Sequence, residues 1–409
     1  MINHQEIAAK VAEVKKDFPT FFHYPGLAYL DNAATSQMPQ AVIDTLHHSL
    51  VHTNANIHRG VYRQSAQATQ LYEECRIKVA NFLNAEGGHC IAFTKGTTES
   101  INVVASSWLK PRIQAGDNVV ITLMEHHANI LPWQHLCNQV GASLRVVPVD
   151  EKGELMVNQL IELMDNNTRL LAITHLSNTL GTVNPIGKII ARAKHKQVPV
   201  LVDAAQSAAL HHLDLQALQP DFLTFSAHKM FGPFGVGILY VHPDHHRNMQ
   251  PYSLGGGMVK DVFLDYTDYQ NYPFSLDAGT PNVSGVITLG ATIDYLNQLN
   301  RDWAVQHVNH LTHYCVNELE KIPGVHLVGN SKTRSGVVSF VVENIHPHDL
   351  ASFYNNEQIA VRAGQHCTQP LLDSLNVPAT VRASFSIYND ETEVERLVKV
   401  TREIIDLWQ

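Results

Sequence analysis

Cysteine is scarce in this chain, and its pattern argues against a disulfide-stabilised extracellular fold. The 409 residues contain five cysteines, an odd number, and they lie far apart, at positions 75, 90, 137, 315 and 367. Scattered single cysteines in a long chain indicate reduced thiols, as in the cytoplasm. The first 18 residues carry charges throughout and lack the apolar core of a signal peptide. We therefore expect a soluble, cytoplasmic protein.

Long apolar runs and blocks of basic charge are also missing. No segment approaches the ~20 consecutive apolar residues that a membrane-spanning helix needs. The net charge is −9 and the lysines and arginines do not cluster, so binding to nucleic acid is not expected. Histidine is abundant, at 25 residues, but no HExxH motif or Cys/His zinc spacing occurs. We therefore expect no membrane, nucleic-acid or metal site.

Two apolar strands that end near reactive side chains are the most informative feature of the sequence. Val198–Val202 leads directly into Asp203, and Phe222–Phe225 is followed shortly by Lys229. Apolar, β-branched runs separated by a helix-length connection are typical of parallel strands buried on both faces. Ligands of such sheets bind at the carboxyl ends of the strands. Asp203 and Lys229 are therefore predicted to share one rim.

A carboxylate and an amine at one rim fit the cofactor pyridoxal 5'-phosphate. Its aldehyde condenses with a lysine, and an acid holds its ring nitrogen protonated. Partial desolvation lowers the pKa of a lysine and makes the free amine available. Gln206 follows Asp203 by three residues and is expected at the same ring edge. Asn178 follows another predicted strand and is expected to hydrogen-bond the phenolic oxygen of the ring.

A glycine turn supplies a candidate phosphate site. A predicted strand at Cys90–Phe93 precedes TKGTTES, in which a helix begins near Thr97. The N-terminus of a helix offers free N–H donors and the positive end of the helix dipole, which favour phosphate. Thr98, with Thr97 behind it, is therefore the candidate for holding the cofactor phosphate.

The alternation of strands and helices sets the predicted domain organisation. Strand–helix alternation from Cys90 to Val241 predicts an α/β, doubly wound sheet. The chain is expected to be irregular after Val241 and to enter a helix at Val283–Leu299 that joins two domains. From Trp303 the pattern is that of a small α+β domain. We predict a large domain at residues 20–295 and a small domain formed by residues 1–19 and 296–409.

The motifs DAAQ, from Asp203, and SAHK, ending at Lys229, resemble those of the class V branch of fold-type-I PLP enzymes. Within it the chain resembles group II cysteine desulfurases, both SufS-like and cysteine-sulfinate-desulfinase-like, from Tyr29 to the C-terminal helix. The resemblance implies a mostly parallel seven-stranded sheet between helices and a smaller α+β C-terminal domain. It also implies a homodimer that converts L-cysteine to L-alanine and passes the sulfur to a SufE-like acceptor protein.

The same resemblance assigns roles to residues outside the rim pair. His126, in EHHAN, would stack on the cofactor ring and shuttle a proton. Ser226 and His228 would bind the phosphate, and Thr280, in LDAGTPNVSG, would reach the phosphate of the neighbouring subunit. The residues that it places on the substrate side or at the subunit interface are Asn32, Ala33 and His58.

One cysteine is expected to determine which PLP-dependent reaction the protein catalyses. The segment IAVRAGQHCTQPLL predicts a strand, then a loop carrying Arg362, His366 and Cys367, then a helix. Thiolate is the nucleophilic form of cysteine and is favoured by nearby cations. The resemblance makes Cys367 the acceptor of the substrate sulfur, whereas the other four cysteines occupy apolar positions typical of buried structural thiols. Arg382 is expected to anchor the α-carboxylate of the substrate, and Arg362 to contact the substrate as well.

Three alternatives stay open at this point. A PLP aminotransferase of the same fold would need no thiol, and would release a keto acid in place of alanine and sulfide. A catalytically inactive scaffold protein should tend to lose its reactive lysine, but Lys229, Asp203 and Cys367 are all present. The RAGQHC motif is similar to the desulfinase-like subgroup, so selenocysteine and cysteine sulfinate remain further candidate substrates.

Overall fold

The computed structural model describes residues 4–408 and is built around one central sheet. Seven strands lie in the order β2-β8-β7-β6-β5-β3-β4. They are β2 (Ile91–Thr94), β3 (Asn118–Thr122), β4 (Ser143–Val147), β5 (Thr168–Thr174), β6 (Val200–Asp203), β7 (Phe222–Ser226) and β8 (Gly237–Val241). Only β8 runs antiparallel to its neighbours in this sheet. The prediction of a mostly parallel seven-stranded sheet is confirmed.

Alternate residues of each central strand belong to two different hydrophobic layers. In β5, Leu171 and Ile173 pack in one layer, and Leu170 and Ala172 pack in the other, with all four fully buried. Successive side chains of a strand point to opposite faces of a sheet, so a strand covered on both sides must be apolar throughout. Burial of each leucine and isoleucine side chain contributes about 1.5–3 kcal/mol.

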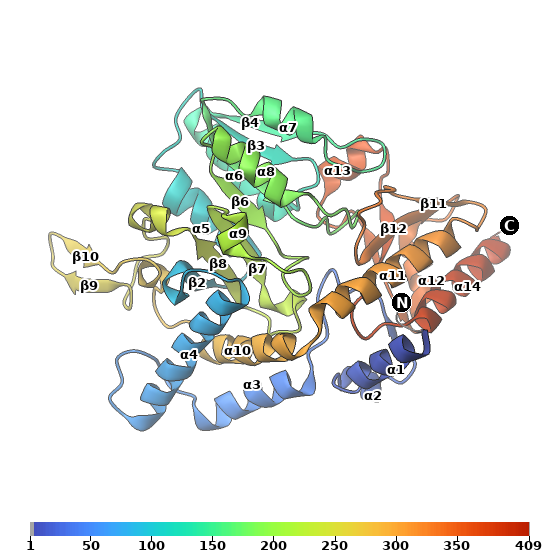
Figure 1. Ribbon diagram of the computed structural model, residues 1–409, viewed down its shortest axis with the longest axis horizontal. Coiled ribbons are helices and arrows are strands. Elements are labelled where there is room, and N and C mark those ends of the chain that lie inside the picture. Colours follow the sequence, from blue (N-terminus) through green and yellow to red (C-terminus); the bar gives the residue numbers. More distant parts are fainter. Residues whose placement is uncertain (1–3, 409) are drawn as a thin grey trace.

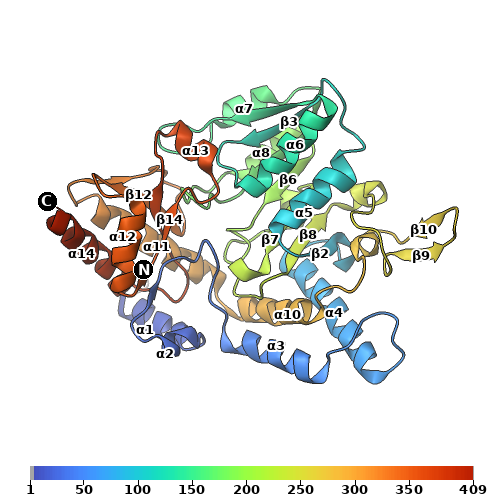
Figure 2. The same ribbon diagram turned by 180° about the vertical axis from the view of Figure 1, so that it is seen from behind.

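Helices cover both faces of this sheet (Figure 1, Figure 2). On one face lie α4 (Arg63–Phe82), α8 (Ile186–His195) and α10 (Val283–Gln298), and on the other lie α5 (Thr97–Val103) and α6 (Leu131–Val140). Further helices of this part of the chain are α3 (Gln40–His52), α7 (Val157–Leu163) and α9 (Leu215–Leu218). The sheet therefore forms the middle layer of three, as the α/β prediction requires.

The C-terminal part of the chain forms a second, smaller sheet. Its order is β11-β12-β15-β14, with every pair antiparallel. These strands are β11 (Val325–Leu327), β12 (Val337–Val342), β14 (Arg362–Gly364) and β15 (Thr380–Ser384). The helices of this region are α11 (Arg301–Leu319), α12 (Pro347–Asn356), α13 (Gln369–Ser374) and α14 (Glu391–Trp408). The expectation of a smaller α+β part is thus confirmed, although Arg362 lies in β14 and not in the predicted loop.

The N-terminal segment connects the two parts. Helices α1 (His4–Lys15) and α2 (Thr20–His23) are followed by the short strand β1 (Ala28–Tyr29), which pairs with β13 (Ile359–Ala360). Lys15 pairs with Glu393 of α14 at 2.6 Å, whereas Phe18 packs against Phe231 and Tyr388. The boundaries predicted at 19/20 and 295/296 stay a prediction, and residues 1–3 of the first segment lie outside the described residues.

The segment after β8 contains an element that the sequence did not reveal. A hairpin of β9 (Val259–Val262) and β10 (Thr267–Tyr269) projects from the body of the molecule in both views (Figure 1, Figure 2). Within residues 4–408, no helix combines the length and the apolar character needed to cross a membrane. The same described residues contain no group of three or more His, Cys, Asp or Glu side chains placed to hold a metal.

Candidate active site

A cavity of about 270 Å³ lies at the rim where β5, β6 and β7 end, and the small sheet closes its other side. Thirteen of the sixteen predicted site residues line it: Ala33, Thr97, Thr98, His126, Asn178, Asp203, Gln206, Ser226, His228, Lys229, Arg362, Cys367 and Arg382. Asp203 ends β6, and Lys229 follows β7 by three residues. Parallel strands therefore deliver both reactive groups to one space, as their sequence positions suggested.

Burial shifts the pKa values of both members of this pair. Burial lowers the pKa of Lys229, opposed chiefly by the nearby Asp203 carboxylate. Burial raises the pKa of Asp203, opposed by the Ala205 N–H, which donates to Asp203 Oδ1 at 2.9 Å, and by Lys229. A desolvated amine gives up its proton more readily, which is the form required to condense with an aldehyde. The carboxyl group of Asp203 is the acid that can pair with the protonated ring nitrogen of the cofactor.

One end of the cavity has the donors that a phosphate requires. Helix α5 begins at Thr97, whose N–H donates to Ser226 Oγ at 2.8 Å, and Thr97 Oγ1 and Ser226 Oγ also lie 2.8 Å apart. His228 Nδ1 is buried and has no hydrogen-bond partner among the described residues. Hydroxyl groups, the N-terminus of a helix and a buried imidazole nitrogen without a partner fit the phosphate of pyridoxal 5'-phosphate. Two glycines pack tightly behind this end: a Cβ on Gly237 would lie 2.4 Å from the Gly96 backbone.

His126 is neutral and has a fixed tautomer. Its Nδ1 accepts a hydrogen bond from the Ala128 N–H at 3.1 Å, so the ring proton resides on Nε2. Burial, together with the positive charge of Lys229, lowers the pKa of His126 to about 4. A neutral imidazole can lie against an aromatic ring without placing another cation beside Lys229.

A buried carboxylate, which the sequence did not single out, supports the His126 turn. Glu125 Oε1 accepts from Thr122 Oγ1 at 2.5 Å and from the Thr174 N–H at 3.0 Å, whereas Oε2 accepts from Asn129 Nδ2 at 2.7 Å. Glu125 thereby ties the end of β3 to the end of β5. Burial raises its pKa to about 8.

The segment after β1 holds the turn that carries Lys229. The carbonyl oxygen of His228 accepts from the Ser36 N–H at 2.9 Å and from Thr35 Oγ1 at 2.9 Å. Gln206 Nε2 donates to the Ala33 carbonyl at 2.8 Å. Ala33 and Gln206 therefore both line the cavity, while the Gln206 side chain also anchors the segment beside it.

Cys367 lies on a loop whose backbone is in an uncommon conformation. His366 and Cys367 have φ values of 52° and 57°, in the left-handed region that residues other than glycine rarely adopt. Cys367 is the one exposed cysteine of the five; Cys75, Cys90, Cys137 and Cys315 are buried, as predicted. Each left-handed residue of this kind costs on the order of 1–3 kcal/mol unless its surroundings hold it.

The large part of the molecule holds this loop by direct hydrogen bonds. The His127 N–H donates to the Cys367 carbonyl at 2.8 Å, and His127 Nε2 accepts from the Gln369 N–H at 3.2 Å. Asn178 Nδ2 donates to the His366 carbonyl at 2.8 Å. His127 therefore holds the loop at Cys367 and just after it, and Asn178 holds it just before.

We expect His127→Ala to release the Cys367 loop and lower sulfur transfer about 2–10-fold, the value of one hydrogen bond. Deuterium exchange at the Gln369 amide should accelerate in this variant, whereas the exchange of core amides should not. His127→Gln offers an acceptor oxygen near the position of Nε2 and serves as the matched control, with activity close to wild type. Equal losses in both variants would rule out the Nε2 hydrogen bond as the cause.

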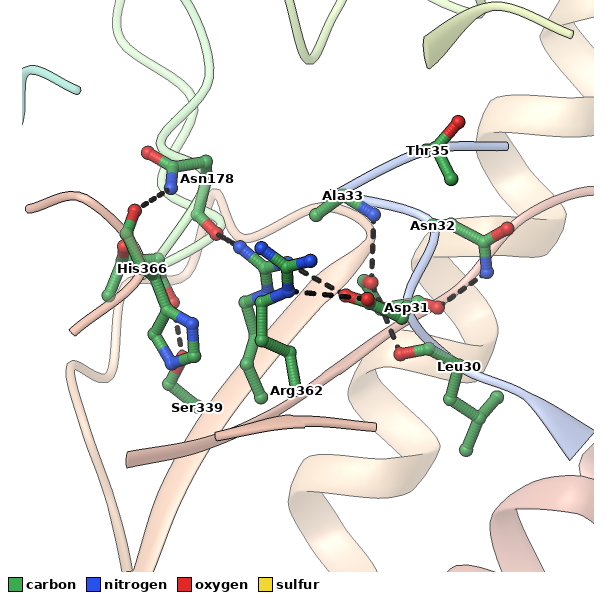
Figure 3. A network of polar contacts seen from close by, with 12 residues as sticks. Leu30, Asp31, Asn32, Ala33, Thr35, Asn178, Ser339, Arg362 and His366 are labelled. Atoms are coloured by element: carbon green, nitrogen blue, oxygen red, sulfur yellow. Dashed lines mark hydrogen bonds and ion pairs between the residues drawn. The ribbon is translucent and has the colours of Figure 1, made fainter. Parts of the chain in front are cut away.

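Arg382 and Arg362 form the substrate side of the cavity. Arg382 is 3% exposed; its Nη1 donates to the Asn178 carbonyl and its Nη2 to Asp31 Oδ1, both at 2.9 Å. Arg362 Nε donates to Asp31 Oδ2 at 3.3 Å (Figure 3). Arg382 Nε is buried and has no partner among the described residues, which leaves a donor for an incoming carboxylate.

Three predicted residues lie outside this cavity in a single chain. Asn32 is buried beside it and donates to the carbonyls of Ser384 at 2.6 Å and Tyr29 at 3.1 Å. His58 and Thr280 line a separate hollow of about 490 Å³. The roles assigned to all three stay predictions.

Comparison with known proteins gives a consistent family assignment. Residues 28–397 match the family model described as aminotransferase class-V. A cysteine desulfurase from Enterobacter sp. (strain 638) is 46% identical over 398 residues, covering 96% of this chain and 98% of the relative. A cysteine desulfurase from Thermococcus onnurineus NA1 superposes with a TM-score of 0.92 at 37% identity, covering 97% of this chain and 98% of its own. The cysteine desulfurase CsdA (S-sulfonic acid) from Escherichia coli gives a TM-score of 0.91 at 36% identity, with the same coverage of both chains.

The fold and the cavity thus define a fold-type-I, PLP-dependent enzyme, and the cofactor prediction is confirmed. The chain belongs to the aminotransferase class-V family, among its cysteine desulfurases. The resemblance noted from DAAQ and SAHK is therefore confirmed, and the CsdA match agrees with its group II character. The subgroup suggested by RAGQHC stays a prediction.

Proposed function

We propose that this enzyme removes the sulfur of L-cysteine, yielding L-alanine and a persulfide on Cys367. The observation that supports the proposal most is the presence of an exposed cysteine in the same cavity as Lys229, Asp203 and Arg382. An aminotransferase has no use for a thiol at that place. The name shared by the relatives, cysteine desulfurase, agrees with this reaction.

Pyridoxal 5'-phosphate, when bound, supplies an electron sink for the substrate Cα. Lys229 would hold its aldehyde carbon, Asp203 its ring nitrogen, and Thr97, Thr98, Ser226 and His228 its phosphate. His126 would lie against the ring, and Asn178 and Gln206 would contact its edge. These assignments rest on the lining of the cavity and on the buried Nδ1 of His228, which has no partner among the described residues.

On the substrate side, a residue of this chain carries out each step. Arg382 binds the α-carboxylate, because its Nε–H is buried and lacks a partner among the described residues. The Lys229 amine, whose pKa burial lowers, takes the proton from Cα. The Cys367 thiolate then attacks the substrate sulfur: its S–S bond forms as the substrate C–S bond breaks. Two protons then complete alanine. Cβ takes one in place of the lost sulfur, which balances the proton given up by the Cys367 thiol, and Cα takes one from Lys229 in place of the proton that Lys229 removed.

The outer sulfur atom of the Cys367 persulfide is then transferred to a second thiol. A persulfide on an exposed loop can be attacked by the thiol of an acceptor protein of the SufE-like kind, which restores Cys367. We place the cycle in the cytoplasm, since Cys367 must stay reduced between turnovers. Iron–sulfur cluster assembly is the proposed destination of the sulfur, and selenocysteine and cysteine sulfinate are proposed as further substrates. A homodimer would bring Thr280 and His58 of a neighbouring subunit toward the phosphate end.

The test is a product balance on the purified holoenzyme with L-cysteine and a thiol reductant. We expect alanine and sulfide in equal amounts, formed catalytically. The same samples are analysed for keto acid, with an amino-group acceptor present in a parallel reaction. Keto acid without alanine would reject desulfuration and favour the aminotransferase alternative.

A further inference from the structure

A second, smaller chamber lies beside Lys229. It has a volume of about 60 Å³, and the residues that line both this chamber and the main cavity are Ala33, Leu176, Gln206 and Lys229. Gln206 Nε2 donates to the Ala33 carbonyl at 2.8 Å, so these two residues form part of the wall between the two spaces. Lys229 is therefore accessible from two sides.

The chamber lies between the large and the small part of the molecule. Backbone hydrogen bonds hold its wall on the small side: the Phe385 N–H donates to the Gly336 carbonyl at 2.8 Å, and the Ser335 N–H donates to the Gly181 carbonyl at 2.9 Å. The chamber is thus a built feature of the contact between the two parts. The residues that bound it are Ala209 and His211 on the large side and Ser335, Gly336 and Phe385 on the small side.

The polar groups of the chamber need partners that water can supply. Ser335 is 4% exposed, and its hydroxyl makes no hydrogen bond with another of the described residues. Buried polar groups are almost always hydrogen-bonded, and they bond to water where no protein group is within reach. A volume of about 60 Å³ has room for a few water molecules. We therefore expect ordered water between Ser335 and Lys229.

His211 lies where the chamber approaches the surface. It is half-buried, and the exposed His212 follows it. Its ring packs edge-on against the ring of the buried His175, with centroids 5.6 Å apart. Burial lowers the pKa of His211, so its imidazole is neutral near neutral pH. A neutral imidazole accepts a hydrogen bond at one nitrogen and donates one from the other, which allows it to pass on a proton.

We propose that this chamber is a proton route, in which water molecules exchange the proton of Lys229 with solvent by way of His211. The inference rests on the proposed function, in which Lys229 takes the Cα proton of the substrate. The main cavity must hold both the cofactor and the substrate, so water is displaced from the side of Lys229 that faces them. In the exchange one N–H bond of the Lys229 ammonium group breaks toward water and another forms, with no net change of charge.

The route determines where the hydrogen at Cα of the product comes from. In D₂O, exchange replaces the proton that Lys229 removed before Cα is protonated again. Without exchange that proton stays one of three on the ammonium group, so about one third of the alanine would keep it. In a single turnover of L-cysteine by the wild-type holoenzyme in D₂O, we expect less than about a tenth of the alanine to keep hydrogen at Cα.

Ala209→Leu fills the chamber with a larger apolar side chain. We expect the fraction of alanine with hydrogen at Cα to rise at least about threefold, because water no longer reaches Lys229 from this side. Ala209→Ser leaves room for water and is the matched control, with a fraction equal to that of wild type. His211→Phe removes the relay at a half-buried position and should raise the fraction too, which keeps the test available if Ala209→Leu folds poorly. The fraction is a ratio within the product and does not depend on the amount of folded enzyme.

A second measurement does not depend on desulfuration. Replacement of the Cα hydrogen of L-alanine by deuterium uses Lys229 and needs no thiol, so it can be followed in Cys367→Ser. Adding Ala209→Leu to this variant should slow the replacement at least about fivefold. The dissociation constant of L-alanine, followed by the visible absorbance of the bound cofactor, should stay within about twofold.

Either of two results would overturn the inference. Equal fractions of retained hydrogen in wild type, Ala209→Leu and His211→Phe would show that the Lys229 proton does not exchange through the chamber. A crystal structure of the holoenzyme with no ordered water between Lys229 and Ser335 would remove the route itself. Failure of the proposed function looks different: no alanine would then form from L-cysteine, whereas deuterium incorporation into L-alanine would still report on the chamber.

Discussion

Replacing Lys229 by alanine is expected to lower desulfuration of L-cysteine by about 10⁴-fold or more, because one side chain serves both as the cofactor anchor and as the base. Among the described residues that line the cavity, Lys229 is the only lysine. Burial lowers its pKa, and both Arg382 and Arg362 add to this effect. Alanine provides no amine to condense with the aldehyde and none to take the Cα proton.

A spectroscopic and a covalent measurement separate this role from a loss of folding. Wild-type holoenzyme should show a visible absorption band that borohydride removes, and mass spectrometry should then find the cofactor attached to Lys229. Lys95→Ala is a suitable control, since the Lys95 side chain is 86% exposed close to the phosphate end of the cavity. It should keep both signals. If the cofactor were still found attached to Lys229→Ala after borohydride reduction, Lys229 would not be its anchor.

The rim residues could be predicted because the pattern that locates them is short-range. The predicted strand Phe222–Phe225 is β7 with one more residue at its end, and the strand before Asp203 shifts by only two residues at its start. Apolar runs identify buried strands, and parallel strands bring their carboxyl ends together whatever the details of packing. Asp203, Lys229 and Asn178 follow from these two rules alone.

Other features depend on contacts between distant residues, which no local pattern encodes. The left-handed backbone at His366 and Cys367 is held by His127 and Asn178, some 190 to 240 positions away in the chain. Asp31 pairs with Arg382 across 351 positions, and its only local signal is a carboxylate after a two-residue strand. The assignment of Arg362 to a loop was wrong because β14 is stabilised by pairing with β15 and not by an apolar run of its own.

Cys367→Ser is expected to lower sulfide release from L-cysteine at least about 10³-fold while the substrate still binds. A serine hydroxyl occupies the same place but stays protonated near neutral pH and cannot form a persulfide. Arg382, Arg362 and Asp31 are unchanged in this variant, so the affinity for L-cysteine should stay within about twofold of wild type.

Because the other four cysteines are buried, alkylation can be assigned to Cys367. A thiol-alkylating reagent should modify wild type at Cys367 first, because Cys75, Cys90, Cys137 and Cys315 are buried and burial raises their pKa values. Cys137→Ala is the matched control and should keep full desulfuration in its folded fraction. If Cys367→Ser retained more than about a tenth of the wild-type rate, the attacking sulfur would have to come from elsewhere, such as the added reductant. Omitting the reductant in a single-turnover reaction separates these sources: only the wild type and Cys137→Ala should then carry one extra sulfur atom, on the peptide that contains Cys367.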